Sequence, residues 1–407
     1  MGSGPHSSVS FQPVSSYDVL GDLLRRANTS APDMLFADTA TSLAQLGCRH
    51  MALYVVDYEQ ETLRRVALDP ELLTEAPGEV NIVGTMAGRA FQLQEVLTAP
   101  TDGGWSIWTP VRERAERIGV LEAHFEEPRD DAIELCEHVG RLLGHLIRTA
   151  DHYTDAFELC RRRQPMSLAA EIQWHLLLPP LAFRAPDVAV AGIMEPAYDV
   201  AGDAFDYTLN GDILSFAMLD AMGHGLTSSL ASALCLTGLR YGRLRKMELD
   251  EIAHQIDEAL LAQFNGETFV TGHLVRLNTS DGQVTWINAG HPDPLVIRGS
   301  AIVGEAHAEP CLPLGLRINV AEIGRLRLEP GDRLLFYSDG VIEARPTGGG
   351  QFGLARLQER VERHLADRLI PAELIRRIVK EVIGHRGGPL ADDASLVMIE
   401  WRPDNGA

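Results

Sequence analysis

The stretch AFDYTLNGDILSFAMLD, residues 204–220, consists of two β-rich runs joined by Asn210-Gly211. Asn-Gly between two such runs is a strong signal for a β-hairpin with a two-residue turn. With these two residues as the turn, Asp203 lies opposite Met218. Asp220 is then a diagonal neighbour of Asp203 on the same face, because side chains alternate along a strand. The sequence therefore predicts an antiparallel hairpin that carries two carboxylates on one face.

The aspartate pair calls for a positive partner. Residues 213–219 are almost entirely apolar on both faces of the strand, which predicts that the strand is buried. A buried carboxylate pair needs a counter-charge, and the hairpin contains no Lys or Arg. Two more acidic sites lie at strand ends: Asp339 closes the run RLLFYSD, and Asp392-Asp393 precedes ASLVMIEW. Each alone is also typical of a plain turn, but together the carboxylates favour Mg²⁺ or Mn²⁺ over zinc.

The sequence around this hairpin predicts a domain of antiparallel sheets covered by helices. A strand is indicated at VAVAGIM (188–194), two helices at about 225–245 and 249–264, and a second hairpin in FVTGHLVRLNTSDGQVTWINAG (269–290). Two more helices follow the strand that ends at Asp339, and ASLVMIEW closes the domain as a strand. Consecutive hairpins with paired helices between them are typical of this α/β (α+β) architecture.

The N-terminal half has a different organisation. Residues 1–15 read as a short disordered lead-in without the pattern of a signal peptide. An amphipathic helix, the β-rich run MALYVVDY (51–58) and the apolar run IGVLEAHF (118–125) then predict a mixed α/β domain over residues 16–128.

Residues 129–165 predict one linker helix of about 35 residues that carries an apolar seam with the period of a coiled coil. The run of arginines and Pro165 mark the end of this helix. Two interpretations remain open: the helix mediates a homodimer, or it is the last helix of the first domain, packed on its own sheet. The seam residues are Cys136, Val139, Leu143, Leu146, Ala150, Tyr153, Phe157 and Cys160.

Composition limits the class of protein. The chain has 407 residues, of which 45% are hydrophobic and 23% charged, as expected of a globular protein with more than one domain. Its net charge of −21 argues against nucleic-acid or membrane-surface binding as the main task. The five cysteines are irregularly spaced and indicate a reducing compartment, so we expect a cytoplasmic protein.

Several sequence blocks of the second half resemble, in order, those of the SpoIIE/RsbU-like branch of the PPM metal-dependent Ser/Thr protein phosphatases. The resemblance runs from about residue 166 to 402. The N-terminal domain resembles a GAF sensor domain, through its topology and the block 84–91, with a PAS domain as the alternative. The phosphatase blocks are Glu171-Ile172-Gln173, Ala201-Gly202-Asp203, Asp220-Ala221-Met222-Gly223-His224-Gly225, Asn288-Ala289-Gly290-His291-Pro292, Leu312-Pro313-Leu314-Gly315, Ser338-Asp339-Gly340 and Asp392-Asp393-Ala394-Ser395.

The resemblance implies an αββα sandwich with a site for two divalent cations, Mn²⁺ or Mg²⁺, at one end. It implies that a hydroxide bridging the two cations attacks phosphorus, so that phospho-Ser or phospho-Thr is hydrolysed without a phosphoenzyme. The implied substrate is a phosphorylated STAS-type anti-anti-sigma factor, and the implied regulator is the N-terminal sensor domain. The alternative is a catalytically silent binding module of the same fold. The implied metal ligands are Asp203, Asp220, the backbone carbonyl of Ala221, Asp339 and Asp392, with Asp203 and Asp220 also counted as catalytic.

Some positions depart from the family pattern or have a lesser role in it. Ala201 stands where the family has Gly, and Ala-Met follows the bridging aspartate, but every acidic position is filled. Asp206 and Asp393 are expected to be supporting acids. His224 and His291 are expected to be turn or packing residues, with proton transfer as the less favoured interpretation.

The spacing Cys311-x5-Arg317 matches that of cysteine-dependent phosphatases. The five residues between them are Leu-Pro-Leu-Gly-Leu, which is not the Gly/Ser-rich phosphate loop that cysteine chemistry requires. We therefore expect this spacing to be a chance match.

Overall fold

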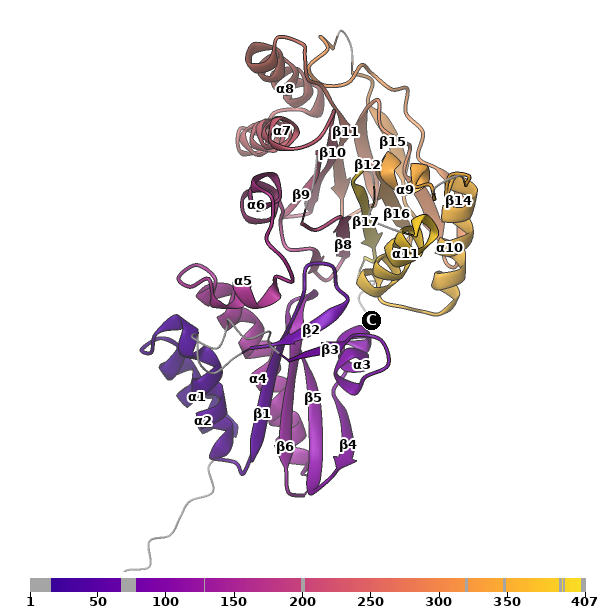
Figure 1. The fold of residues 1–407 in the computed structure, drawn as a ribbon. Coiled ribbons are helices and arrows are strands. Elements are labelled where there is room, and N and C mark those ends of the chain that lie inside the picture. The colour runs from indigo at the N-terminus through magenta and orange to yellow at the C-terminus, as the bar shows by residue number, and fades with distance from the viewer. Residues whose placement is uncertain are drawn as a thin grey trace, which may run out of the picture. The chain divides into compact units, whose positions relative to one another are not determined.

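The computed structural model describes residues 16–66, 78–127, 129–198, 202–318, 321–346, 349–387, 390 and 392–403. The expected lead-in over residues 1–15 and Ala201 lie outside the described residues. The chain divides into two compact units, Met1–Glu113 with Arg117–Arg163, and Arg114–Glu116 with Gln164–Ala407 (Figure 1). Among the helices described, none has both the length and the apolar character needed to cross a membrane.

The N-terminal unit is built on one six-stranded sheet with the order β3-β2-β1-β6-β5-β4. The pairs β1–β2, β1–β6, β2–β3 and β4–β5 are antiparallel. This mixed α/β organisation is the one predicted. The strands are β1 (His50–Val56), β2 (Thr62–Arg65), β3 (Glu79–Asn81), β4 (Leu97–Thr101), β5 (Gly104–Glu113) and β6 (Glu116–Phe125).

Helices bury both faces of this sheet. On one face, apolar side chains of the strands pack with those of α1, α2, α4 and α5. On the other face, Phe91 of α3 packs with Tyr54 and Trp108. The helices are α1 (Ser16–Ala27), α2 (Leu35–Ala44), α3 (Met86–Leu93), α4 (Asp130–Ala150) and α5 (Ala156–Arg161).

The expectation of one continuous helix over residues 129–165 is wrong. Helix α4 ends at Ala150 and a separate helix, α5, begins at Ala156. Most of the apolar seam is the inner face of the N-terminal unit, since Val139, Leu143 and Phe157 are buried in its core. The structure therefore supports the second interpretation, a last helix packed on its own sheet, and the homodimer stays a prediction.

Two glycines explain why α4 lies so close to β5. A Cβ at Gly140 would stand 2.7 Å from the carbonyl oxygen of Pro110, and one at Gly144 would overlap the carbonyl oxygen of Arg112. A seven-residue apolar period does not distinguish a coiled coil from a helix on a sheet. Gly140 and Gly144, one helical turn apart beside the seam, indicate a helix packed closely on a sheet.

The C-terminal unit contains two antiparallel sheets. One has the order β15-β12-β11-β10-β9 and the other β14-β13-β16-β17-β8-β7. The strands are β7 (Ala182–Arg184), β8 (Val188–Glu195), β9 (Asp203–Asn210), β10 (Ile213–Ala221), β11 (Val270–Asn278), β12 (Gln283–Ala289), β13 (Leu295–Arg298), β14 (Ala301–Glu305), β15 (Gly324–Arg327), β16 (Arg333–Tyr337) and β17 (Ala394–Trp401).

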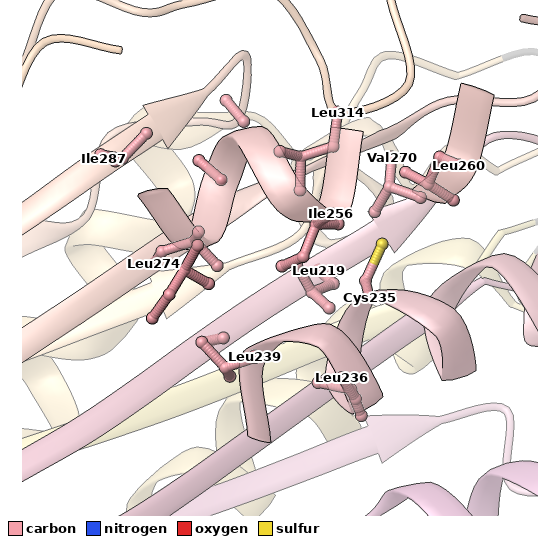
Figure 2. Close-up of a cluster of buried hydrophobic side chains, with 14 of the residues drawn as sticks. Leu219, Cys235, Leu236, Leu239, Ile256, Leu260, Val270, Leu274, Ile287 and Leu314 are labelled. Carbon is pink, nitrogen blue, oxygen red and sulfur yellow. The ribbon is translucent and has the colours of Figure 1, made fainter. Parts of the chain in front are cut away.

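The two sheets pack face to face and helices cover their outer sides, which confirms the predicted αββα layering (Figure 1). The core between the sheets contains Phe216 and Trp286 of one sheet and Phe336 and Val397 of the other. Figure 2 shows one outer layer, where Leu219 and Leu274 of the sheet face helix residues such as Leu236 and Ile256. The helices are α6 (Leu168–Ile172, continued by a π-helical turn over Gln173–Leu177), α7 (Leu226–Leu244), α8 (Leu249–Phe264), α9 (Asp339–Glu343), α10 (Leu354–Ala366) and α11 (Pro371–Arg386).

The register of the β9–β10 hairpin differs from the prediction by two residues. Asn210 pairs with Ile213, and Asp203 lies directly opposite Asp220 rather than opposite Met218. The two-residue turn is Gly211-Asp212, with Gly211 at φ +57°, so a glycine at the first turn position supplies the left-handed backbone. Directly opposed side chains have Cβ atoms about 5 Å apart, so the two carboxylates lie closer than a diagonal pair would.

The packing of α4 predicts an opposite effect for two Gly-to-Ala changes. Gly144→Ala should destabilise the N-terminal unit by roughly 1–3 kcal/mol, because the new methyl group overlaps backbone atoms of β5. Gly21→Ala in α1 is the matched control, since nothing lies within 4 Å of its Cβ and alanine favours helix. Calorimetric melting of the full chain measures both. A Gly144→Ala chain as stable as the control would contradict the packing of α4 on the sheet.

Candidate metal centre

Acidic residues of both sheets meet at one end of the sandwich. Asp203 of β9 and Asp220 of β10 project from the face on which Phe205 and Met218 enter the core between the sheets. Asp339 begins α9 directly after β16, and Asp392 precedes β17. Because β16 and β17 are neighbours in the opposite sheet, these two aspartates face the same end of the sandwich. The fold thus brings together the four predicted acidic ligands.

The Asp203–Asp220 pair is electrostatically unfavourable without a cation. Asp203 is 2% exposed, and its Oδ2 is buried without a hydrogen-bond partner among the described residues. Burial, then the charge of Asp220 and that of Asp393, raises the pKa of Asp203 well above its usual range. Burial and the charges of Asp339, Asp392 and Asp393 raise the pKa of Asp220 to about 7.

One cavity of about 710 Å³ gives access to this end of the sandwich. Asp220, Ala221, Asp339 and Asp392 line it, whereas Asp203 is buried and does not. Burial and the nearby Asp392 raise the pKa of Asp339. Among the described residues, the lining includes four aspartates and no Lys or Arg: Asp220, Ala221, Met222, Gly223, His224, Phe269, Thr271, Asn288, Gly290, His291, Pro292, Asp293, His307, Ala308, Pro310, Asp339 and Asp392.

Asp393 has a structural role. Its Oδ2 accepts hydrogen bonds from the backbone N–H groups of Gly202, at 2.9 Å, and Asp203, at 3.2 Å. A Cβ at Gly202 would overlap the carbonyl oxygen of Ala221, and one at Gly340 would overlap the carbonyl oxygen of Asp393. Glycine is therefore required at both positions, and these contacts fix the backbone that carries Asp203, Ala221 and Asp339.

Asp206 belongs to a different network. It is 3% exposed and bonds Arg240 at 2.9 Å and Arg243 at 3.0 Å, both on α7. These ion pairs hold α7 against β9 and leave the Asp206 carboxylate fully engaged away from the cavity. Its supporting role was expected, and the structure identifies the arginines as its partners.

The two histidines considered from sequence lie in the cavity wall in different states. His224 is exposed. His291 is buried, and its Nδ1 lies 3.1 Å from Thr271 Oγ1, which also approaches the carbonyl oxygen of Asp220 at 3.5 Å. Burial and the neighbouring His273 lower the pKa of His291 to about 3, so this imidazole is neutral. His291 is therefore a packed wall residue near Asp220.

Two residues of the cavity wall were not predicted from the sequence: Asp293 and His307, which form a hydrogen-bonded group with Asn288. Asp293 directly follows the Asn-Ala-Gly-His-Pro block and could have been noticed there. His307 lies in a loop after β14, and no local pattern distinguishes it from any other loop histidine.

The residues present fit divalent cations, and two observations support this. A buried oxygen of Asp203 lacks a hydrogen-bond partner among the described residues. Within the same residues, the carboxylates of Asp220, Asp339 and Asp392 have no positive partner. An all-oxygen set of carboxylates and a backbone carbonyl suits Mg²⁺ or Mn²⁺. Within the described ranges, no three acidic, histidine or cysteine side chains already form a closed cation-binding cluster. Mg²⁺ usually keeps several waters and few protein ligands, so an open arrangement is compatible with it.

The raised pKa of Asp220 predicts a pH-dependent stability difference between the metal-free protein and its Asp220→Asn variant. Between about pH 4 and about pH 7 the unfolded carboxyl is ionised while the folded one keeps its proton. The wild type therefore loses stability relative to Asp220→Asn as pH rises through this window. Other titrating groups, such as His291, contribute to the pH dependence of stability in both proteins, so their contribution cancels in the comparison. Melting temperatures measured in EDTA check this, and a constant difference from pH 4 to 8 would contradict it.

Replacing Asp206 and replacing Asp220 should have different effects on Mn²⁺ affinity. Asp206→Asn should lower stability by about 2 kcal/mol, because it weakens charged hydrogen bonds to Arg240 and Arg243, but should leave Mn²⁺ affinity unchanged. Asp220→Asn should lose Mn²⁺ affinity. Isothermal titration calorimetry measures both affinities. If Asp206→Asn weakened Mn²⁺ binding as much as Asp220→Asn, the separation of the two networks would be wrong.

Comparison with known proteins identifies the C-terminal unit. Residues 210–402 match the family model "Stage II sporulation protein E (SpoIIE)". The chain is 24% identical over 322 residues to protein IcfG of Synechocystis sp., which covers 70% of this chain and 46% of IcfG. It is 22% identical over 271 residues to phosphoserine phosphatase RsbU of Bacillus subtilis, which covers 63% of this chain and 76% of RsbU.

The chain thus spans just under half of the length of IcfG. A solved structure of the RsbU and RsbW domains of Rv1364c from Mycobacterium tuberculosis aligns with a TM-score of 0.46 at 22% identity, over 53% of this chain and 62% of that one. The matched residues include three of the four acidic positions of the candidate site, Asp220, Asp339 and Asp392, but not Asp203. Residues 210–402 of this chain form a SpoIIE domain of the PPM phosphatase type.

Proposed function

We propose that residues 166–402 form a metal-dependent phosphatase that hydrolyses phospho-Ser or phospho-Thr in a protein. One observation carries the proposal: aspartates from both sheets converge, with uncompensated charge, on the wall of a single open cavity. A buried carboxylate set with raised pKa values in a cleft is typical of a functional site. The membership of residues 210–402 in the SpoIIE family supports the same reaction.

In the proposed site, Asp203, Asp220, Asp339, Asp392 and the carbonyl of Ala221 hold two divalent cations, Mn²⁺ or Mg²⁺. When bound, such cations neutralise phosphoryl oxygens and acidify a water for attack on phosphorus. Asp393 and Gly202 keep the ligand-bearing backbone in place. The neutral ring of His291 fills the wall beside Asp220 without adding charge. The cavity of about 710 Å³ is wide enough for a phosphorylated side chain to enter.

Cysteine chemistry is a poor alternative. Cys311 is absent from the residues that line the cavity, and burial raises the pKa of its thiol, which disfavours the nucleophilic thiolate. The backbone N–H of Arg317 bonds Asp257 at 3.1 Å in a loop fixed to α8. These two residues form part of a structural loop.

For the substrate, we propose a phosphorylated STAS-type anti-anti-sigma factor. One of the relatives is named a phosphoserine phosphatase, RsbU, and this name supports phosphoserine as the hydrolysed group. We further propose that the N-terminal unit is a GAF-like sensor domain that regulates the phosphatase domain.

The alternative function is a silent binding module of the same fold. Loss of a cation ligand would favour it, but each of the four acidic positions is filled and faces the same end of the sandwich. Calorimetric titration with Mn²⁺ distinguishes the two, because a silent module that binds no cation would release no heat of binding.

The proposed function predicts the effect of two single changes in the same hairpin. Asp220→Asn should reduce Mn²⁺-dependent hydrolysis of p-nitrophenyl phosphate and of a phosphoserine peptide by about 10³-fold or more, because the site loses a central charge. Asp212→Asn, an exposed turn residue of the hairpin, is the matched control and should keep full activity. Initial rates with Mn²⁺ and with EDTA measure both. Equal rates for Asp220→Asn and the control would refute the assignment.

A further inference from the structure

The wall of the cavity that Asp220, Asp339 and Asp392 line also contains a hydrogen-bonded carboxylate–imidazole pair. Asp293 Oδ2 lies 2.6 Å from His307 Nδ1, and both residues line the cavity. Asn288 Nδ2 donates to the other oxygen, Asp293 Oδ1, at 3.0 Å. The carboxylate is therefore oriented on one side by an amide and on the other by an imidazole.

This geometry determines which ring atom of His307 is available. An ionised carboxylate only accepts hydrogen bonds, so Nδ1 carries a proton and points at Asp293. Nε2 is left as the ring atom that can exchange a proton with a ligand. The side chain of His307 is 69% exposed, whereas that of Asp293 is 16% exposed, so the imidazole extends from a more buried support.

The loop that carries His307 does not depend on this pair for its position. The backbone N–H of Ala306 bonds the carbonyl of Pro294 at 2.8 Å, and that of Cys311 bonds the carbonyl of Asn288 at 2.9 Å. Main-chain bonds thus fix both ends of the loop.

The surroundings of His307 favour its charged form. Its hydrogen bond to Asp293 and the charge of that carboxylate raise its pKa, with smaller effects of Glu309 and Glu305. The carboxylates of Asp220, Asp339 and Asp392 and the ring of His224 line the rest of the cavity. Within the described part of the chain, no Lys or Arg lines the cavity. His307 lines it and has an acidic partner, Asp293, which favours the cationic form of the imidazole.

The other histidines near the cavity are less suited to give a proton. His291 and His273 are buried, and their pKa values are lowered to about 3 and about 4, so both are neutral. His224 lines the cavity, but among the described residues it has no acidic partner that would fix its ring. A proton donor needs both a position at the reacting atoms and a suitable charge state.

We propose that His307 is the general acid of the reaction, with Asp293 as its positioning residue; this inference rests on the proposed function. The attacking water releases one proton to solvent as its oxygen bonds phosphorus, and the bond between phosphorus and the seryl or threonyl oxygen breaks. The electron pair of that bond goes to the seryl or threonyl oxygen, which takes the proton from His307 Nε2. Neutral His307 then regains a proton from solvent. Protein alkoxides are poor leaving groups, so the site is matched to alkyl phosphate esters rather than to aryl esters.

Leaving-group dependence tests this role in the full chain with Mn²⁺. Nitrophenolate leaves without a proton, whereas a serine alkoxide does not. His307→Gln should therefore keep its rate on p-nitrophenyl phosphate within about twofold and lose about 10²-fold or more in kcat on a phosphoserine peptide. The alkaline limb of the wild-type pH profile on the peptide should disappear in His307→Gln and move to lower pH in Asp293→Asn. His138→Gln, on the exposed surface of α4, is the control and should match the wild type on both substrates.

Several results would overturn the inference. Equal loss on both substrates in His307→Gln would indicate a role in structure or binding, and no loss on the peptide would exclude proton donation. An NMR titration provides a readout apart from activity: the His307 ring should lose its raised pKa in Asp293→Asn, and an unchanged titration would exclude the positioning role. Absence of Mn²⁺-dependent turnover in the wild type on either substrate would instead overturn the proposed function, and this inference with it.

Discussion

Repulsion among buried carboxylates is the constraint on which the C-terminal unit depends. Asp203 and Asp220 are directly opposed on adjacent strands, and the opposite sheet adds Asp339 and Asp392 at the same end of the sandwich. Raising the pKa of Asp220 from 3.8 to about 7 corresponds to a free-energy penalty on the order of 4 kcal/mol for its ionised form without a cation. That penalty is a large part of the net stability of an ordinary domain. The domain tolerates this penalty because three extensive apolar clusters stabilise the sandwich and its helices. A bound cation would relieve the repulsion among the carboxylates, and the free energy gained would contribute to cation affinity.

The backbone around these carboxylates is fixed by contacts that no side chain could replace. Gly202 and Gly340 lie where a Cβ would overlap a carbonyl oxygen of the facing segment, and Asp393 accepts two backbone N–H groups. Each ligand-bearing segment is thereby held by a segment of another strand. In this chain, the block Ser338-Asp339-Gly340 thus combines a charged residue with a glycine that allows close approach of the facing backbone.

The sequence predicted the layers and the acidic set but not their detailed geometry. Hydrophobic alternation was sufficient to infer antiparallel sheets, and two aspartates in one hairpin were sufficient to propose a candidate cation site, because both depend on local chemistry. The register was wrong by two residues, since Asn210-Gly211 and Gly211-Asp212 are both reasonable turns and only the paired strands decide between them. The seam over residues 136–160 was ambiguous for a similar reason, because one apolar stripe serves a partner helix or a sheet equally well. Asp293 and His307 were missed because their association is created by tertiary structure.

The distribution of charge around the cavity has a consequence for substrate binding. The chain carries a net charge of −21, and the cavity lining contributes aspartates but, within the described residues, no Lys or Arg. A phosphoprotein brings at least one and a half further negative charges in its phosphate group. Under the proposed function, the metal-free cavity should therefore repel a phosphorylated substrate, and the attraction needed for binding has to come from bound cations. Substrate recognition and catalysis are then both conditional on the same carboxylates, which makes cation binding the step that the rest of the reaction requires.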